Sequence, residues 1–275
     1  MTAATKETAI LRRAPSPGRR RIGRPSDRLL FGVLGFVGIL VVWELAADVG
    51  MFKKSLMSAP SLIWKAGVTD FTSGALWPHI GTSMSEWLVG FAIAAIVGIP
   101  LGLAIGWFRH LDYLASVLLS ALYATPKVAL VPMIILVAGI GLEAKVIVVL
   151  LLSIFAIIVS TVAGVHSVDK RHQDIARSFG ASQSLIFRSV VLPSTIPFIL
   201  SGLRIGVGRA LVGVVVAEFL VANQGLGWYI SFNGTMLNSS RVYLGILLLG
   251  GFGIALGEFI RLFEKRFDVW RPEIN

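Results

Sequence analysis

Residues 146–165, VIVVLLLSIFAIIVSTVAGV, form a run of twenty residues without a single charged side chain. A helix of about 20 apolar residues matches the hydrocarbon thickness of a lipid bilayer. Similar runs recur along the 275-residue chain, so that 55% of its residues are hydrophobic and only 15% are charged. Soluble domains carry about 25% charged residues. These features predict an integral membrane protein built from helices.

Six segments of the chain are long and apolar enough to cross a bilayer. The sequence therefore predicts an all-α fold with about six transmembrane helices. The membrane domain is expected at 29–265, between a basic N-terminal tail at 1–28 and a short C-terminal tail at 266–275. The predicted spans are 29–48, 85–107, 113–138, 144–165, 196–221 and 242–261.

Lysines and arginines concentrate on one side of the predicted spans: in residues 1–28, at Arg109, in the 166–193 loop and after residue 260. Cytoplasmic segments are enriched in these residues, so both termini and the 166–193 loop are predicted to be cytoplasmic. The net charge of +10 therefore fits topology and anionic headgroups better than nucleic acid. The first span is interpreted as an uncleaved signal anchor rather than a cleaved signal peptide, because its apolar run exceeds a typical signal core.

Residues 50–84 are too polar to cross the bilayer and too apolar to be a free linker. They alternate apolar and polar residues and contain Trp64 and Trp77, and tryptophan is enriched at membrane interfaces. The sequence predicts an amphipathic helix on the outer interface here.

Small residues recur at every fourth position of the second predicted span, at Gly90, Ala94, Gly98, Gly102 and Gly106. Because residues i and i+4 share one helix face, this spacing predicts a groove into which another helix packs closely. The fifth and sixth predicted spans contain similar series of glycine and alanine. The pattern predicts a tightly packed bundle and carries no information about chemistry.

Prolines and charges occur inside the predicted spans. Pro126 and Pro132 each remove a backbone hydrogen bond from the third span. This span is therefore either a kinked packing helix or a helix that lines a pathway and bends during gating. The charged residues either pair with neighbouring helices or line a pathway whose positive charge favours an anion. We favour pairing, because a lone fixed positive charge would also trap its substrate. The charged residues considered for these two roles are Lys127, Arg204, Arg209 and Glu218.

No catalytic or cofactor-binding pattern occurs in the sequence. It lacks the G-x-x-x-x-G-K-[ST] phosphate loop and contains no cysteine. Its four histidines show no metal-ligand spacing, and no paired carboxylates or Ser-His set suggests catalysis. We therefore expect a protein that is not an enzyme and that binds no metal or cofactor itself.

The polar segment 173–197, QDIARSFGASQSLIFRSVVLPSTIP, interrupts the apolar runs. It predicts a short helix, a break at Gly180, and a second amphipathic stretch that Leu192 and Pro193 end. A compact segment of this kind suits docking into a groove on a soluble partner.

Residues 174–193 of this segment resemble the cytoplasmic loop of binding-protein-dependent ABC importer permeases, whose pattern is EAA, three residues, Gly, nine residues, then I-x-L-P. Ala176, Gly180, Leu192 and Pro193 match at the family spacing, while Asp174 replaces the glutamate. The segments TPKVALVPMIILVAGIG and ANQGLGWYI resemble the nitrate, sulfonate and taurine subgroup of these permeases.

The resemblance implies the membrane subunit of an ATP-driven importer with a type I fold, located in the bacterial inner membrane. It implies a homodimer of permeases, two ATPase subunits that use ATP, an extracytoplasmic solute-binding protein, and a small solute such as a sulfonate, taurine or nitrate. A secondary transporter without an ATPase is the alternative, with Glu218 as its candidate coupling-ion carboxylate. The residues implied to couple to the ATPase are Asp174, Ala176, Gly180, Ala181, Leu192 and Pro193.

Overall fold

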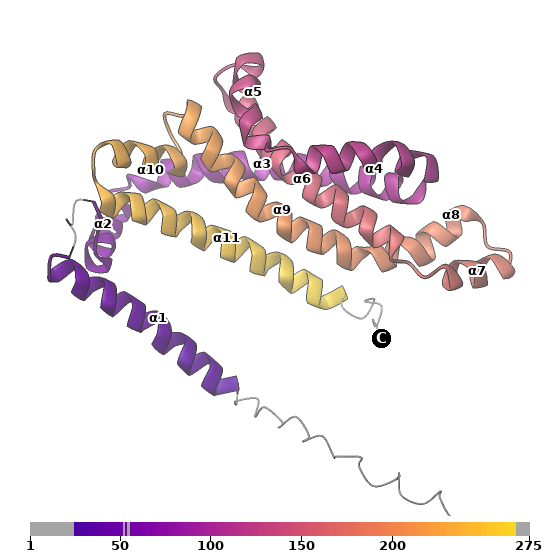
Figure 1. Ribbon diagram of the computed structural model, residues 1–275, viewed down its shortest axis with the longest axis horizontal. Coiled ribbons are helices and arrows are strands. Elements are labelled where there is room, and N and C mark those ends of the chain that lie inside the picture. Colours follow the sequence, from indigo (N-terminus) through magenta and orange to yellow (C-terminus); the bar gives the residue numbers. More distant parts are fainter. Residues whose placement is uncertain (1–24, 52, 54–55, 268–275) are drawn as a thin grey trace, which may run out of the picture.

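The computed structural model describes residues 25–51, 53 and 56–267 (Figure 1). The predicted N-terminal tail lies outside these residues up to position 24, and the predicted C-terminal tail lies outside them from position 268. Every regular element of the described residues is helical, which confirms the predicted all-α fold. The elements are α1 (Pro25–Asp48), α2 (Pro60–Thr72), α3 (Leu76–Trp107), α4 (Arg109–Ala124), η1 (Lys127–Leu130), α5 (Val131–Ala138), α6 (Leu142–His166), α7 (Lys170–Ser178), α8 (Gln183–Ile186), η2 (Phe187–Val191), α9 (Leu192–Val221), α10 (Leu226–Thr235) and α11 (Ser239–Phe267).

Among the described residues, five helices are long and apolar enough to cross a membrane, and a sixth span results if one bent pair counts as a single span. The second span is longer than predicted, because α3 begins at Leu76 rather than at residue 85. His79, Ser83 and Glu86 lower the hydropathy of this part of α3. Each of them nevertheless has a hydrogen-bonding or charged partner on another element, so the helix continues through them.

The bent pair lies where the sequence predicts a kinked third span. α4 and the following η1–α5 segment meet at an angle of 85°, so residues 113–138 form a broken span and not one helix. Pro126 lies at the break. Pro132 lies in the first turn of α5, where a missing backbone N–H is tolerated. The two prolines therefore end one helix and start another.

α6 lies at the centre of the bundle and packs along its length against both α3 and α9 (Figure 1). The glycines of α3 permit this approach. A Cβ built on Gly90 would lie 2.6 Å from Val149 Cβ, and one built on Gly102 would lie 2.7 Å from Thr161 Cβ. The predicted close packing along this row of small residues is confirmed.

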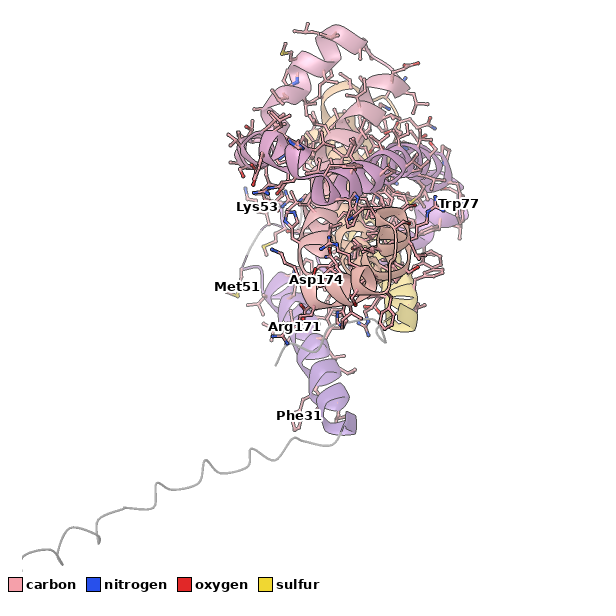
Figure 2. All side chains as sticks on the ribbon, turned by 90° about the vertical axis from the view of Figure 1, so that its right-hand side faces the viewer. Phe31, Met51, Lys53, Trp77, Arg171 and Asp174 are labelled. Carbon is pink, nitrogen blue, oxygen red and sulfur yellow. The ribbon has the colours of Figure 1, made fainter. Side chains whose placement is uncertain are left out.

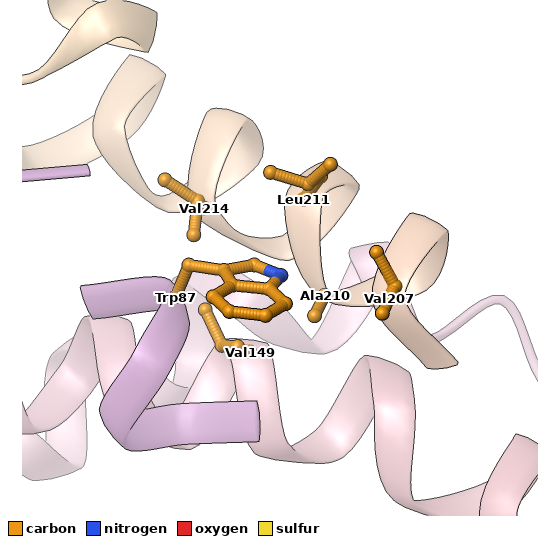
Figure 3. Packing of buried hydrophobic residues seen from close by; sticks show 6 residues of the cluster. All are labelled: Trp87, Val149, Val207, Ala210, Leu211 and Val214. Carbon is orange, nitrogen blue, oxygen red and sulfur yellow. The ribbon is translucent and has the colours of Figure 1, made fainter. Parts of the chain in front are cut away.

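Trp87 fills the space where α3, α6 and α9 meet. The residue is 7% exposed, and its ring packs in a cluster with residues of α6 and α9 (Figure 3). The other members of the cluster are Val149, Val207, Ala210, Leu211 and Val214.

α11 packs less closely than the small residues of the sixth predicted span suggest. Cβ atoms built on Gly250 and Gly257 would meet nothing within 4 Å in this chain, whereas one on Gly253 would lie 3.2 Å from Leu211. The predicted close packing is therefore found at Gly253 alone among these three glycines. Small residues make close packing possible, but they do not determine which neighbour is present.

α2 lies within the segment predicted to form an interfacial helix. Trp64 and Trp77, the predicted interface anchors, are 77% and 60% exposed. Glu44 of α1 binds the start of α2, where it accepts hydrogen bonds from the backbone N–H of Ser61 (2.9 Å) and from the Ser61 hydroxyl (2.6 Å). The part of the predicted segment after residue 75 belongs to α3.

A buried carboxylate joins α2 to α10 and α11. Arg241 donates two hydrogen bonds of 2.8 Å to Asp70, and the Tyr229 hydroxyl donates a third of 2.6 Å. Burial alone would raise the pKa of Asp70, but the hydrogen bonds from Arg241 and Tyr229 outweigh burial, so this pKa lies below its ordinary value. Burial and the bond to Asp70 raise the pKa of Tyr229, which stays protonated as a donor.

Candidate functional site

The coupling segment, residues 170–186, lies at one end of the bundle and comprises α7, the turn around Gly180, and α8. Asp169 begins it, because its carboxylate accepts a hydrogen bond of 2.8 Å from the backbone N–H of Arg171. Figure 2 looks onto this end of the molecule, with Arg171 and Asp174 labelled there. Asp174 pairs with Arg177 at 2.9 Å, one turn further along α7.

The turn after α7 explains why the pattern contains a glycine. The Gly180 N–H bonds to the Arg177 carbonyl at 2.9 Å, and the Ala181 N–H bonds to the Ala176 carbonyl at 3.1 Å. This pair of bonds is a Schellman motif, which ends a helix with a residue in the left-handed conformation. Gly180 occupies that position with φ = +77°. Three of the residues predicted to couple to the ATPase therefore form one helix-ending turn.

Apolar side chains of the coupling segment are exposed. Phe179 is 87% exposed, Ile175 is 56% exposed and Leu185 is 53% exposed. The charged side chains of Asp174 and Arg177 in the same segment are also exposed. This surface combines a rigid turn with apolar and charged contacts, as a helix-in-groove docking element requires.

Leu192 and Pro193 lie inside a helix and do not end one. The helical stretch runs from Gln183 to Val221 without interruption, so the prediction of a separate second short helix is wrong. A short π-helical segment, η2, allows the helix to continue from α8 into α9, because Leu192 donates its N–H to the Phe187 carbonyl five residues back. Short π-helical segments inside α-helices are frequent at functional sites. α8 and the membrane helix α9 are therefore joined as one stretch.

A second candidate region lies at the break between α4 and η1. A cavity of about 530 Å³ opens here, and Tyr123, Lys127 and Arg209 contribute to its lining. The Arg209 guanidinium lies 3.4 Å from the Tyr123 hydroxyl. The Lys127 ammonium lies 4.9 Å from the ring centre of Phe155 and 5.4 Å from that of Tyr123. We call this region the cation cavity.

The two cations of this cavity have no carboxylate partner among the described residues. Their contacts are aromatic rings, the Tyr123 hydroxyl and the Tyr123 carbonyl. Two like charges that share one aromatic neighbour repel each other unless an anion or water screens them. The arrangement can therefore attract a small anion.

The other two charged residues of the predicted pathway have protein partners. Arg204 of α9 pairs with Glu264 of α11 at 3.0 Å. Glu218 accepts a hydrogen bond of 2.6 Å from the Ser83 hydroxyl of α3. The structure thus separates the four residues into two that face the cation cavity and two that join helices.

An ion pair that the sequence analysis missed lies at the opposite end of the bundle from the coupling segment. Lys145 and Glu86 form a buried pair at 2.6 Å, with exposures of 8% and 1% for the two residues. Both line a pocket of about 520 Å³, which we call the outer pocket. Lys145 lies at the start of the predicted span 144–165 and is not among the charged residues named for the predicted pathway. The sequence feature that could have indicated this pair is Glu86, an acidic residue at the start of the predicted span 85–107.

The described residues contain no group of three or more His, Asp or Glu side chains arranged to hold a metal ion. His79 accepts a hydrogen bond from the Gly225 N–H at 3.1 Å and stacks on Trp228. His166 lies 3.6 Å from Asp112. These two histidines therefore have protein contacts of their own.

A helical membrane domain with this arrangement is the fold of the transmembrane subunits of type I ABC importers. The MetNI methionine ABC transporter, in inward-facing conformations, matches with a TM-score of 0.54 at 18% identity over 72% of this chain and 94% of that chain. An amino acid ABC transporter solved with histidines matches with a TM-score of 0.58 at 17% identity over 73% and 97%. At these identities the likeness concerns the fold alone.

The chain belongs to the family of binding-protein-dependent transport system inner membrane components, whose pattern matches residues 98–269. The "Putative aliphatic sulfonates transport permease protein SsuC" of Escherichia coli K12 is 33% identical over 86% of this chain and 90% of that protein. The formylaminopyrimidine transport permease protein ThiX of Halalkalibacterium halodurans is 30% identical over 90% and 98%. The taurine transport system permease protein TauC of Escherichia coli K12 is 28% identical, and the match covers 86% of this chain and 88% of that protein. The chain is thus a permease subunit of an ABC importer, and the alternative of a secondary transporter is wrong.

Proposed function

We propose that this chain forms the transport path of an importer for a small organic solute with a sulfonate group, of the alkyl sulfonate or taurine type. Two copies of the chain would assemble with two ATPase subunits and receive solute from an extracytoplasmic binding protein. ATP hydrolysis would occur on the ATPase subunits and none on this chain. The observation that carries the choice of solute is the cation cavity, where Lys127 and Arg209 lack carboxylate partners among the described residues.

The geometry of the cation cavity favours a compact solute that carries a sulfonate group. Its volume of about 530 Å³ is ample for an alkyl sulfonate, and its walls combine two cations with Tyr123 and apolar side chains such as Leu152 and Ile205. Cations bind anionic headgroups, and the apolar walls accept a short carbon chain. The names of the sulfonate and taurine relatives point to the same class of solute.

The coupling segment is proposed to dock on the ATPase subunit. Its exposed Phe179 and Ile175, the Asp174–Arg177 pair and the fixed turn at Gly180 provide a rigid surface for this contact. α8 continues into α9, and α9 carries Arg209 at the cation cavity. A displacement of the docked segment would therefore reach the transport path through one helical stretch.

Uptake of labelled taurine and ethanesulfonate into proteoliposomes that contain the complete complex tests the choice of solute. Lys127→Gln and Arg209→Gln should each lower uptake about tenfold while the complex still assembles, since each removes one charge from the cavity. Arg261→Gln is the matched control, because Arg261 is exposed and pairs with Glu258 away from the cavity. Normal uptake in both cavity variants would contradict the proposal, and loss of assembly would assign the two charges a structural role.

Both termini and the coupling segment are proposed to face the cytoplasm of a bacterial cell, with α10 on the opposite side of the inner membrane. Single cysteines test this arrangement cleanly, because the chain contains none of its own. Ser182→Cys should resist an impermeant thiol reagent added to intact cells, whereas Thr235→Cys should react. Labelling of Ser182→Cys from outside would invert the topology.

A further inference from the structure

Glu218 lies near the end of α9 and is 1% exposed. Both oxygens of its carboxylate accept hydrogen bonds from other elements. One accepts from the Ser83 hydroxyl of α3 at 2.6 Å, and the other accepts from the backbone N–H of Gly227 in α10 at 2.5 Å. The side chain thus ties three helices together at one point.

Side chains of α3 hold the two preceding amides in the same way. The Leu226 N–H donates to Ser83 Oγ at 2.8 Å, and the Gly225 N–H donates to His79 Nδ1 at 3.1 Å. Ser83 therefore accepts a hydrogen bond from the start of α10 and donates one to Glu218. The turn between α9 and α10 has its orientation set by this chain of bonds.

Gly225 in this turn and Gly227 in the first turn of α10 are both required by contact with the same carboxylate. Gly225 has φ = +122°, and a Cβ on it would overlap the Glu218 carboxylate. A Cβ on Gly227 would lie 2.8 Å from a Glu218 oxygen. The backbone at Gly225 and Gly227 thus approaches Glu218 too closely for any residue with a Cβ. The position of the turn therefore depends on the shape and charge of the Glu218 side chain.

The turn held by Glu218 forms one wall of the outer pocket. Val221, Ala222 and Asn223 line this wall, and Lys145 with Glu86 lines the pocket from the side of α6 and α3. The pocket lies at the end of the bundle where solute enters under the proposed function. A shift of the turn would change the width of the pocket and the surroundings of the buried ion pair.

We propose that Glu218 is a positioning residue for solute uptake: it holds the turn at 222–225 in place as a wall of the outer pocket and so sets how readily solute enters the path. Glu218 does not contact solute in this proposal and acts through the turn. The proposal rests on the proposed function, because it takes the outer pocket as the entrance of the transport path.

Glutamine at this position keeps the size of the side chain but not its hydrogen bonding. Its amide has one acceptor oxygen, and its NH₂ group would face a second donor, either the Gly227 N–H or the Ser83 hydroxyl. Ser83→Ala provides a milder change, because it removes the hydrogen bonds of Ser83 to Glu218 and Leu226 but leaves the bond between Glu218 and Gly227. Glu258→Gln is the matched control, since Glu258 is 53% exposed and lies on α11.

The test uses the complete complex in proteoliposomes with a reporter cysteine at Ala222, which is half-buried in the parent. Its rate of labelling by an impermeant maleimide should rise about tenfold with Glu218→Gln and less with Ser83→Ala, as expected when a charge-assisted hydrogen bond is lost. Without the reporter, the KM for taurine or ethanesulfonate uptake should rise by a similar factor, with Vmax per assembled complex within about twofold of the parent.

A purely structural role for Glu218 would lower the amount of assembled complex and leave the KM of the remainder unchanged, which would overturn the proposal. Labelling within twofold of the parent in both variants would also overturn it. If Glu218→Gln does not assemble, Ser83→Ala decides by the same two measurements. If the parent takes up neither sulfonate, the proposed solute is wrong, and the labelling rate alone decides whether Glu218 positions the turn.

Discussion

Substitution of Gly180 tests the physical account of the coupling segment, because its cost should depend on backbone conformation and not on side-chain size. Gly180 has φ = +77°, and a Cβ built on it would meet nothing within 4 Å. A residue with a Cβ in the left-handed region costs about 1–2 kcal/mol. Gly180→Ala and Gly180→Leu should therefore carry the same penalty. Asparagine tolerates this region better, so Gly180→Asn should cost less.

A penalty of about 1–2 kcal/mol lowers the equilibrium constant between the native turn and its alternatives by roughly 5- to 30-fold. If only the native turn docks, the apparent Kd of the ATPase subunit for the permease should rise by up to this factor, and by the same amount for alanine and for leucine. The measurement is co-purification of the ATPase together with solute-stimulated ATP hydrolysis in reconstituted vesicles. Membrane insertion should stay unchanged.

Two outcomes would refute this reasoning. Normal assembly, hydrolysis and uptake in Gly180→Leu would mean that the coupling segment is only a connecting loop. A penalty that grows with side-chain size, small for alanine and large for leucine, would mean that steric contact with the partner matters and the left-handed turn does not.

Three further perturbations have expected outcomes. Gly102→Leu should lower the thermal stability of the purified protein by overpacking the contact of α3 with α6, at a cost of about 1–3 kcal/mol or more, while Gly81→Ala, where a Cβ meets nothing within 4 Å, should change it little. Lys145→Met should cost about 3–5 kcal/mol in an unfolding assay because it leaves the buried Glu86 carboxylate unpaired, and adding Glu86→Gln should recover much of that loss. Because the pKa of Asp70 lies below its ordinary value of 3.8, its contribution to stability is present above that value and is lost as the pH falls through the lower folded-state pKa. The melting temperature of the parent should therefore fall with acid below about pH 3.8 more steeply than that of Asp70→Asn, and equal slopes would contradict this role.

The amino-acid sequence by itself determined the properties that depend on local composition and short spacing. The apolar runs predict the membrane helices, and the small residues at every fourth position of α3 predict its contact with α6. The spacing of Ala176 and Gly180 identifies the coupling segment, because a helix-ending turn is a local structure whose hydrogen bonds span five residues or fewer.

Only the tertiary structure decided where the buried charges belong. Lys145 and Glu86 are 59 positions apart, and Arg241 and Asp70 are 171 apart. Hydropathy counts the cost of burying each of these residues separately, so it predicts neither pair. Folding brings each cation to its carboxylate, and the pairing makes burial tolerable. The tertiary structure likewise decides which charged residues of the predicted pathway are paired. Lys127 and Arg209 line the cation cavity and reach no carboxylate among the described residues. Arg204 and Glu218 reach partners on other helices.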